Sequence, residues 1–291
     1  MNPYLKLLSR KRTWTPVQTS KGKLKEGAEE TIYRALAIRH MELPVGEFIT
    51  DALDKDVPIT ARALLESNVK DEIKHDLALG YITNALGVDE KAEAEALRLR
   101  AAWEQHPDHT LCKALVAERA IFFVLLPFFR FCGDAGLRTV SADISRDEQV
   151  HVATNSLVCT ELGLKPSRSL DLLRKATINW VMEPLKQNTD RYLDKKFWLD
   201  ASDRLMYEGK APEFSQTKAA RMPAFFEHSN VNLLNTLKLH NEKLDDLVDE
   251  LEQNFGWKPI HPKEDINTIM YRAGQASVID YIKTKQTDEE I

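Results

Sequence analysis

Two stretches of the chain share one metal-binding pattern, a glutamate followed three positions later by a histidine. They are Lys70 to His75 and Arg146 to His151, and each contains Asp-Glu-x-x-His. Residues three apart lie on one face of a helix, so each glutamate and histidine can bind one metal ion together. If both pairs serve one dinuclear site, their two helices must lie side by side.

The periodicity of the remaining sequence is helical. Apolar residues recur at helical spacing between Leu24 and Leu53, with a kink expected at Pro44, and Gly87 is a candidate cap for the next helix. We expect further helices near residues 60–86, 89–105, 110–132, 140–162, 169–185, 190–207 and 232–254. Neither strand patterns nor a glycine-rich phosphate loop occurs, which predicts an all-α protein of long antiparallel helices.

Composition narrows the class of protein. The 291 residues are 43% hydrophobic and 29% charged, and the net charge of −5 leaves no basic surplus for nucleic acid. The longest apolar run, 120–129, is too short to span a membrane. Three widely spaced cysteines and a mixed N-terminus without a signal peptide predict a cytoplasmic protein with free thiols.

We expect three segments along the chain. Residues 1–22 read as an irregular N-terminal arm, 23–254 as the helical domain, and 255–291 as a flexible tail that binds a partner.

A helical-bundle site for two metals needs one further carboxylate from each of two other helices. In an antiparallel hairpin, residues at one level are equidistant from the turn. Glu118 and Glu148 are centred on position 133, inside the turn at 133–136. Glu118 also lies in the most apolar helix, where an unpaired carboxylate would be costly.

The same arithmetic selects Glu42 in the first hairpin, because Glu42 and Glu72 are centred on position 57, inside the turn at 54–58. Glu29 and Glu30 are rivals whose midpoints with Glu72 fall before that turn. Alternatively, Glu72 and Glu148 are solvated helix charges and the histidines are their ordinary partners. The predicted metal-binding set is Glu42, Glu72, His75, Glu118, Glu148 and His151. Such ligands suit two first-row metal ions that activate dioxygen.

At these residues the sequence resembles the small, radical-generating subunit of class I ribonucleotide reductase. The segment from Ile144 to His151 is similar to the family's arginine-aspartate-glutamate-x-x-histidine motif, and Glu118 to Phe123 is similar to its third-helix motif. Trp14-x-Pro16 is similar to a segment of the family's N-terminal arm. The resemblance covers residues 13–163 and implies a ferritin-like helical bundle.

The resemblance also implies a route for an oxidising equivalent. His75 would hydrogen-bond Asp147, and Asp147 would contact Trp14. A carboxylate is well suited to orient the second ring nitrogen of a ligating histidine. The alternatives are an ion pair between Asp147 and Arg146, and a packing role for Trp14.

The partner implied is the large catalytic subunit, which reduces ribonucleotides and would dock on the C-terminal tail. Tyr281 would relay the radical to it, with Tyr271 as the rival. A homodimer is implied by analogy.

The sequence departs from the family pattern at two positions. Leu79 stands where most members carry the radical tyrosine, with Tyr81 two residues on, and Glu42 stands where many use aspartate. Both departures resemble the subclass with a manganese–iron cluster, although two irons or two manganese ions would accept the same ligands.

Two other functions fit the same ligands. A ferritin-like oxygenase or oxidase would act on a small hydrophobic or tRNA substrate and would need a channel beside Phe122 and Phe128. A metal store or a purely structural bundle is the third interpretation.

Overall fold

The computed structural model describes residues 2–55 and 57–215, with short stretches at 251, 265–266, 269–270 and 272–277. The chain divides into two compact units, 1–227 and 228–291. The first contains α1 (Pro3–Leu8), α2 (Glu29–Ala37), α3 (Glu42–Leu53), α4 (Ile59–Leu86), α5 (Glu90–Gln105), α6 (Thr110–Ala117), α7 (Phe123–Cys132), α8 (Ala135–Glu161), α9 (Arg168–Met182), α10 (Lys195–Glu208) and α11 (Pro212–Ser215). The helix expected at 232–254 lies outside the described residues, except for Leu251.

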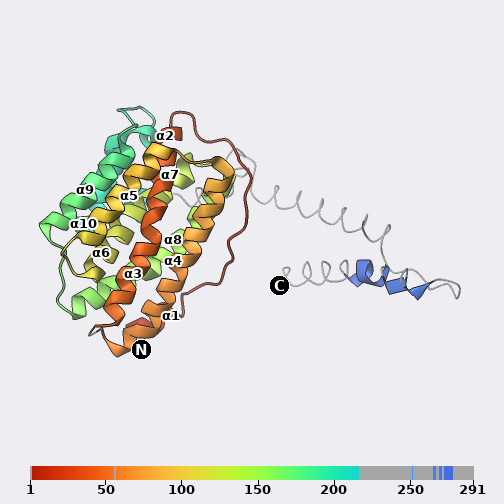
Figure 1. Ribbon diagram of the computed structural model, residues 1–291, viewed down its shortest axis with the longest axis horizontal. Coiled ribbons are helices and arrows are strands. Elements are labelled where there is room, and N and C mark those ends of the chain that lie inside the picture. The colour runs from red at the N-terminus through yellow and green to blue at the C-terminus, as the bar shows by residue number, and fades with distance from the viewer. Residues whose placement is uncertain are drawn as a thin grey trace. The chain divides into compact units, whose positions relative to one another are not determined.

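Helices that lie side by side form the centre of the first unit (Figure 1), and their pairwise contacts close into a ring. Helix α3 packs on α4, α4 on α8, α8 on α6 and α7, and α6 closes the ring against α3. The described residues contain helices and one isolated bridge, between Lys186 and Asp194, but no β-strand. This arrangement is a ferritin-like helical bundle, which confirms the predicted fold class.

The ends of α4 and α8 follow from local chemistry. Gly87 follows α4 with a φ of 92°, a conformation that favours glycine, as the sequence predicts. The side chain of Asp134 accepts a hydrogen bond from the Leu137 amide at 2.8 Å, so α8 begins earlier than expected. Both helices are long enough to carry their Glu-x-x-His pairs near the middle of the bundle.

The segment between Leu24 and Leu53 breaks ahead of the predicted kink. A short 3₁₀ turn, Ile38–Met41, separates α2 from α3. Pro44 lies in the first turn of α3, where a helix does not need the missing N–H. The break therefore places Glu42 at the start of α3.

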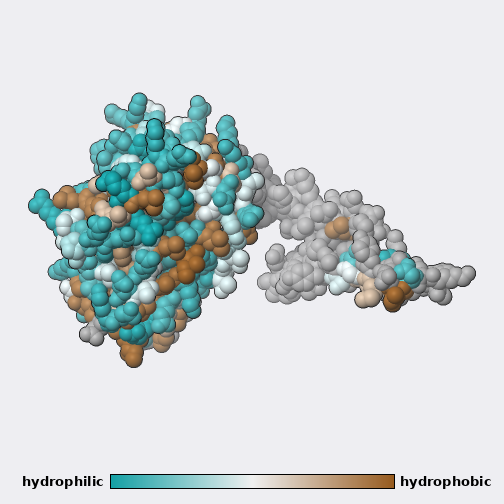
Figure 2. Space-filling view, in the orientation of Figure 1, coloured by the Kyte–Doolittle hydropathy of each residue, from teal (hydrophilic) through white to brown (hydrophobic). Residues whose placement is uncertain are grey.

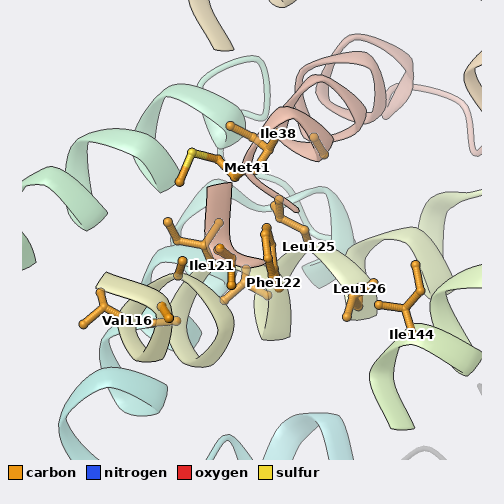
Figure 3. Close-up of a cluster of buried hydrophobic side chains, with 14 of the residues drawn as sticks. Ile38, Met41, Val116, Ile121, Phe122, Leu125, Leu126 and Ile144 are labelled. Carbon is orange, nitrogen blue, oxygen red and sulfur yellow. The ribbon is translucent and has the colours of Figure 1, made fainter. Parts of the chain in front are cut away.

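The helix expected at 110–132 is interrupted at Glu118. Residues Glu118–Phe122 form a π-helical turn between α6 and α7. Such a turn holds one residue more than an α-helical turn and is frequent at functional sites. Figure 3 shows Phe122 and Leu125 below Ile38 and Met41 in the buried core that borders this turn.

The N-terminal arm contains one helix that the sequence did not predict. The side chain of Asn2 accepts from the Tyr4 amide at 2.8 Å, and Pro3 occupies the first helical position, so α1 begins there. Tyr4 and Leu7 form the buried face of α1. The remainder of the arm runs along the outside of the bundle without helix (Figure 1).

The surface of the first unit is largely hydrophilic on the face shown in Figure 2, with scattered apolar residues. Over the described part of the chain, every helix is too short or too polar to cross a bilayer. Cys112, Cys132 and Cys159 are buried and free, as expected.

Candidate metal centre

The six predicted side chains lie together in the centre of the bundle. Helices α4 and α8 each contribute a glutamate and a histidine, and α3 and the π turn contribute one glutamate each. All are buried, and none is more than 2% exposed. Their potential ligand atoms form two groups within 4.8 Å: Glu42, Glu72, His75 and Glu148; and Glu72, Glu118 and His151.

Both histidines turn the same ring nitrogen, Nδ1, toward the carboxylates. His75 Nδ1 lies 3.3 Å from Glu148 Oε1 and 3.7 Å from oxygens of Glu42 and Glu72. His151 Nδ1 lies 2.8 Å from Glu72 Oε1 and 3.6 Å from Glu148 Oε1. Glu72 and Glu148 therefore stand between the two histidines, where carboxylates could bridge two ions.

The cluster contains buried polar atoms without a hydrogen bond to any described residue. They are both carboxylate oxygens of Glu72 and Glu148, one oxygen each of Glu42 and Glu118, and Nδ1 of each histidine. The 2.8 Å contact of His151 with Glu72 is an ion-pair distance without hydrogen-bond geometry. A buried polar atom without a partner costs about 1–3 kcal/mol. Because these atoms point into one space, the residues fit a dinuclear metal site.

The electrostatics of the cluster agree with this fit. Burial raises the pKa of Glu42 and of Glu118 well above the usual value. Burial also opposes charge on Glu72, but His151 and His75 hold its pKa at about 2. Burial lowers the pKa of both histidines, but the neighbouring carboxylates outweigh burial and raise both pKa values well above the usual one. Two divalent cations would displace the protons of the cluster, because their four positive charges match the four negative charges of the ionised glutamates.

The outer ring nitrogen of each histidine faces an aspartate from the opposite helix. His75 Nε2 lies 3.2 Å from Asp147 Oδ2, and His151 Nε2 lies 3.1 Å from Asp71 Oδ2. Such carboxylates fix the orientation of a ligating imidazole. Sequence reasoning missed Asp71, although its place in the second Asp-Glu-x-x-His stretch matches that of Asp147.

The contacts expected for Asp147 are present. The Trp14 indole Nε1 donates to Asp147 Oδ2 at 2.7 Å, and the Trp14 ring lies 6.2 Å from that of His75 at an interplanar angle of 18°. Arg146 instead pairs with Asp143, at 3.4 Å. A continuous path of contacts thus leads from the buried histidine to a half-buried indole in the arm.

Two lysines complete the surroundings and had no sequence signal. Lys11, from the arm, contacts Asp71 and donates to Asn68 Oδ1 at 2.8 Å. Lys74 bridges the two aspartates, with Nζ 2.7 Å from Asp71 Oδ1 and 2.9 Å from Asp147 Oδ2. The same Nζ lies 4.7 Å from the centre of the Trp14 ring.

The surroundings of Glu42 and Glu118 differ from each other. Asn155, one turn after His151, donates to Glu118 Oε2 at 2.7 Å. Glu42 borders a cavity of about 10 Å³ lined mainly by apolar side chains, including Leu79 and Phe122. The two tail tyrosines singled out in the sequence, Tyr271 and Tyr281, lie outside the described residues.

Comparison with protein families gives no match, and comparison with curated proteins gives none either. Among solved structures, the chain is similar to a candidate class I ribonucleotide reductase from Bacillus halodurans, with a TM-score of 0.49 and 15% sequence identity. The similarity covers 75% of this chain and 95% of the other.

Proposed function

We propose that the chain is the small subunit of a class I ribonucleotide reductase and generates an oxidising equivalent for a separate catalytic subunit. The path of contacts from His75 through Asp147 to Trp14 carries this proposal. A bundle that only stored metal, or only held its helices together, would have no need of an oxidisable ring hydrogen-bonded to the partner of a ligand histidine.

The two histidines differ in a way that supports a single exit. Beyond Asp147 lies Trp14, whose indole can lose an electron. Beyond Asp71, at the matching position, lies the ammonium group of Lys11, which cannot. Oxidising equivalents would therefore leave on the His75 side.

In this proposal the ligands are Glu42, Glu72, His75, Glu118, Glu148 and His151. When bound, two first-row metal ions supply the oxidising equivalent by reaction with dioxygen or a reduced oxygen species. Leu79 is 3% exposed and cannot be oxidised, so it cannot store that equivalent as a tyrosine would. A manganese–iron centre suits this situation, and di-iron or di-manganese centres would use the same residues.

The large catalytic subunit is the proposed partner, docking on the C-terminal tail. Tyr281 would pass the radical to it, with Tyr271 as the alternative. We further propose a cytoplasmic homodimer, by analogy with the family.

An oxygenase or oxidase with the same ligands would need space for a substrate beside the metals. The cavity bordering Glu42, of about 10 Å³, has room for roughly one water-sized molecule. That size suits a small oxidant better than a hydrocarbon chain or a tRNA base.

Two experiments test the proposal. Crystals grown with manganese and iron should give anomalous scattering from two ions between the six ligands, and a Glu148→Ala, His151→Ala double variant should bind fewer ions. Unchanged stoichiometry would contradict the metal site. With the large subunit from the same genome, Trp14→Phe and Asp147→Asn should each abolish ribonucleotide reduction while the metals still bind. Activity that survives both substitutions would exclude the radical route.

A further inference from the structure

We propose that Lys74 is a positioning residue that makes Trp14 harder to oxidise, so that the indole passes an oxidising equivalent on instead of trapping it. The inference rests on the proposed function, because it concerns the ring through which that equivalent would leave. It comes from the position of one ammonium group relative to the ring and to Asp147.

Lys74 is the residue before His75 on α4. Its Nζ lies 4.7 Å from the centre of the Trp14 ring, within the range of a cation–π contact. The same Nζ is held between two carboxylates, 2.7 Å from Asp71 Oδ1 and 2.9 Å from Asp147 Oδ2. With a side chain only 18% exposed, Lys74 is fixed over the ring instead of moving freely in solvent.

An ammonium group over an aromatic face attracts the ring while the ring is neutral. When the ring loses an electron it becomes positive, and the attraction becomes repulsion between like charges. Lys74 therefore stabilises the reduced ring and destabilises the oxidised one. Both effects make electron loss from Trp14 less favourable.

The Asp147 carboxylate acts in the opposite direction. It accepts the Trp14 indole N–H at 2.7 Å, and a negative charge at that distance favours a positive ring. Lys74 pairs with this carboxylate and so offsets its effect. Without Lys74, Trp14 would lose an electron more readily and would hold the oxidising equivalent longer.

The step itself is a one-electron transfer. Trp14 loses one electron to an oxidant, the oxidant gains that electron, and the indole proton stays on Nε1 in its hydrogen bond to Asp147. A soluble photo-oxidant can take the electron in a test, so the measurement does not depend on activity. Zinc, which has no redox chemistry, would occupy the metal site of the full-length protein.

The experiment uses photo-oxidants of graded potential and records the transient absorption of tryptophan radicals. Trp14→Phe supplies the background from the other tryptophans. With a given photo-oxidant, we expect Trp14 to be oxidised about tenfold faster in Lys74→Met than in the unaltered protein. Lys74→Arg keeps the positive charge and should keep the rate of the unaltered protein. Asp147→Asn should slow the oxidation of Trp14.

Two controls separate charge from packing. Lys74→Gln is a second neutral variant that keeps a hydrogen-bond donor, and it should agree with Lys74→Met. Lys70→Met removes an exposed lysine one turn earlier on α4 and should leave the rate unchanged. Circular dichroism would verify that the variants are folded. If Lys74 acts on the potential of Trp14, the plot of oxidation rate against photo-oxidant potential should shift along the potential axis, which a change in the access of the photo-oxidant to the ring would not produce.

The failures of the two proposals are distinguishable. Suppose that Lys74→Met and Lys74→Gln are oxidised at the same rate as the unaltered protein, while Trp14→Phe removes part of the radical absorption. The inference about Lys74 is then wrong and the radical route is unaffected. If Trp14→Phe removes no signal, Trp14 is not oxidised, and both the inference and the radical route fail.

Discussion

Metal binding should release protons from the cluster. The pKa values of Glu42, Glu118, His75 and His151 are all raised, the glutamates chiefly by burial and the histidines by neighbouring carboxylates. These two carboxyl groups and two imidazolium groups hold up to four protons. A metal ion binds only the deprotonated forms. Saturation with two divalent ions at pH 7 should therefore release up to about four protons per chain.

The release can be counted by calorimetry with Zn²⁺ in buffers of different ionisation enthalpy. The apparent affinity should rise with pH, by about tenfold per pH unit for each proton displaced. In Glu118→Gln the amide has no acidic proton, so about one proton fewer should appear and one ion should bind more weakly. Glu95→Gln alters a carboxylate paired with Arg98 on α5 and should change neither number.

The result that refutes this reasoning is metal saturation with fewer than one proton released per chain. In that case the four groups are already deprotonated before the metal arrives, and the burial of Glu42 and Glu118 does not keep them protonated.

Three further predictions concern other parts of the molecule. Trp103→Ala removes a fully buried ring whose Nε1 donates to Thr177, and it should lower the free energy of unfolding by about 3–5 kcal/mol in denaturant titration. Asp71→Asn should weaken metal binding by about 10–100-fold in calorimetry, because His151 loses its charged partner; an unchanged affinity would show that Asp71 does not orient His151. Gly136→Ala places a Cβ 2.9 Å from Thr19, so the arm should be cleaved faster in limited proteolysis, whereas equal rates would mean that the arm shifts without loosening.

Much of the site was predictable because short turns fix the register of antiparallel helices. Once Asp134 starts α8 and a turn precedes it, Glu118 and Glu148 must lie near one level. Glu42 follows in the same way from its distance to Glu72 across the first turn. The helical period then decides which side chains share a face.

The surroundings of the site were harder to predict, for two physical reasons. Periodicity assigns Lys74 to a helix face but cannot show that a loop from the N-terminus places Trp14 there. Lys11 lies 60 positions from Asp71, and nothing in its neighbourhood marks it as different from other basic residues of the arm. Helix α1 was missed because its six residues are too few for a periodic pattern.

The π turn at Glu118–Phe122 has a consequence for insertions and deletions. The turn holds one residue more than an α-helical turn, so removing one residue from it should restore a continuous α-helix and keep the faces of α6 and α7. Removing a residue between Phe123 and Phe128 would instead rotate everything after it by about 100° relative to α6. Phe128, which packs edge-on against Trp198, would then leave its place in the core. Within residues 110–132, the π turn is therefore the place where a one-residue deletion should disturb the core least.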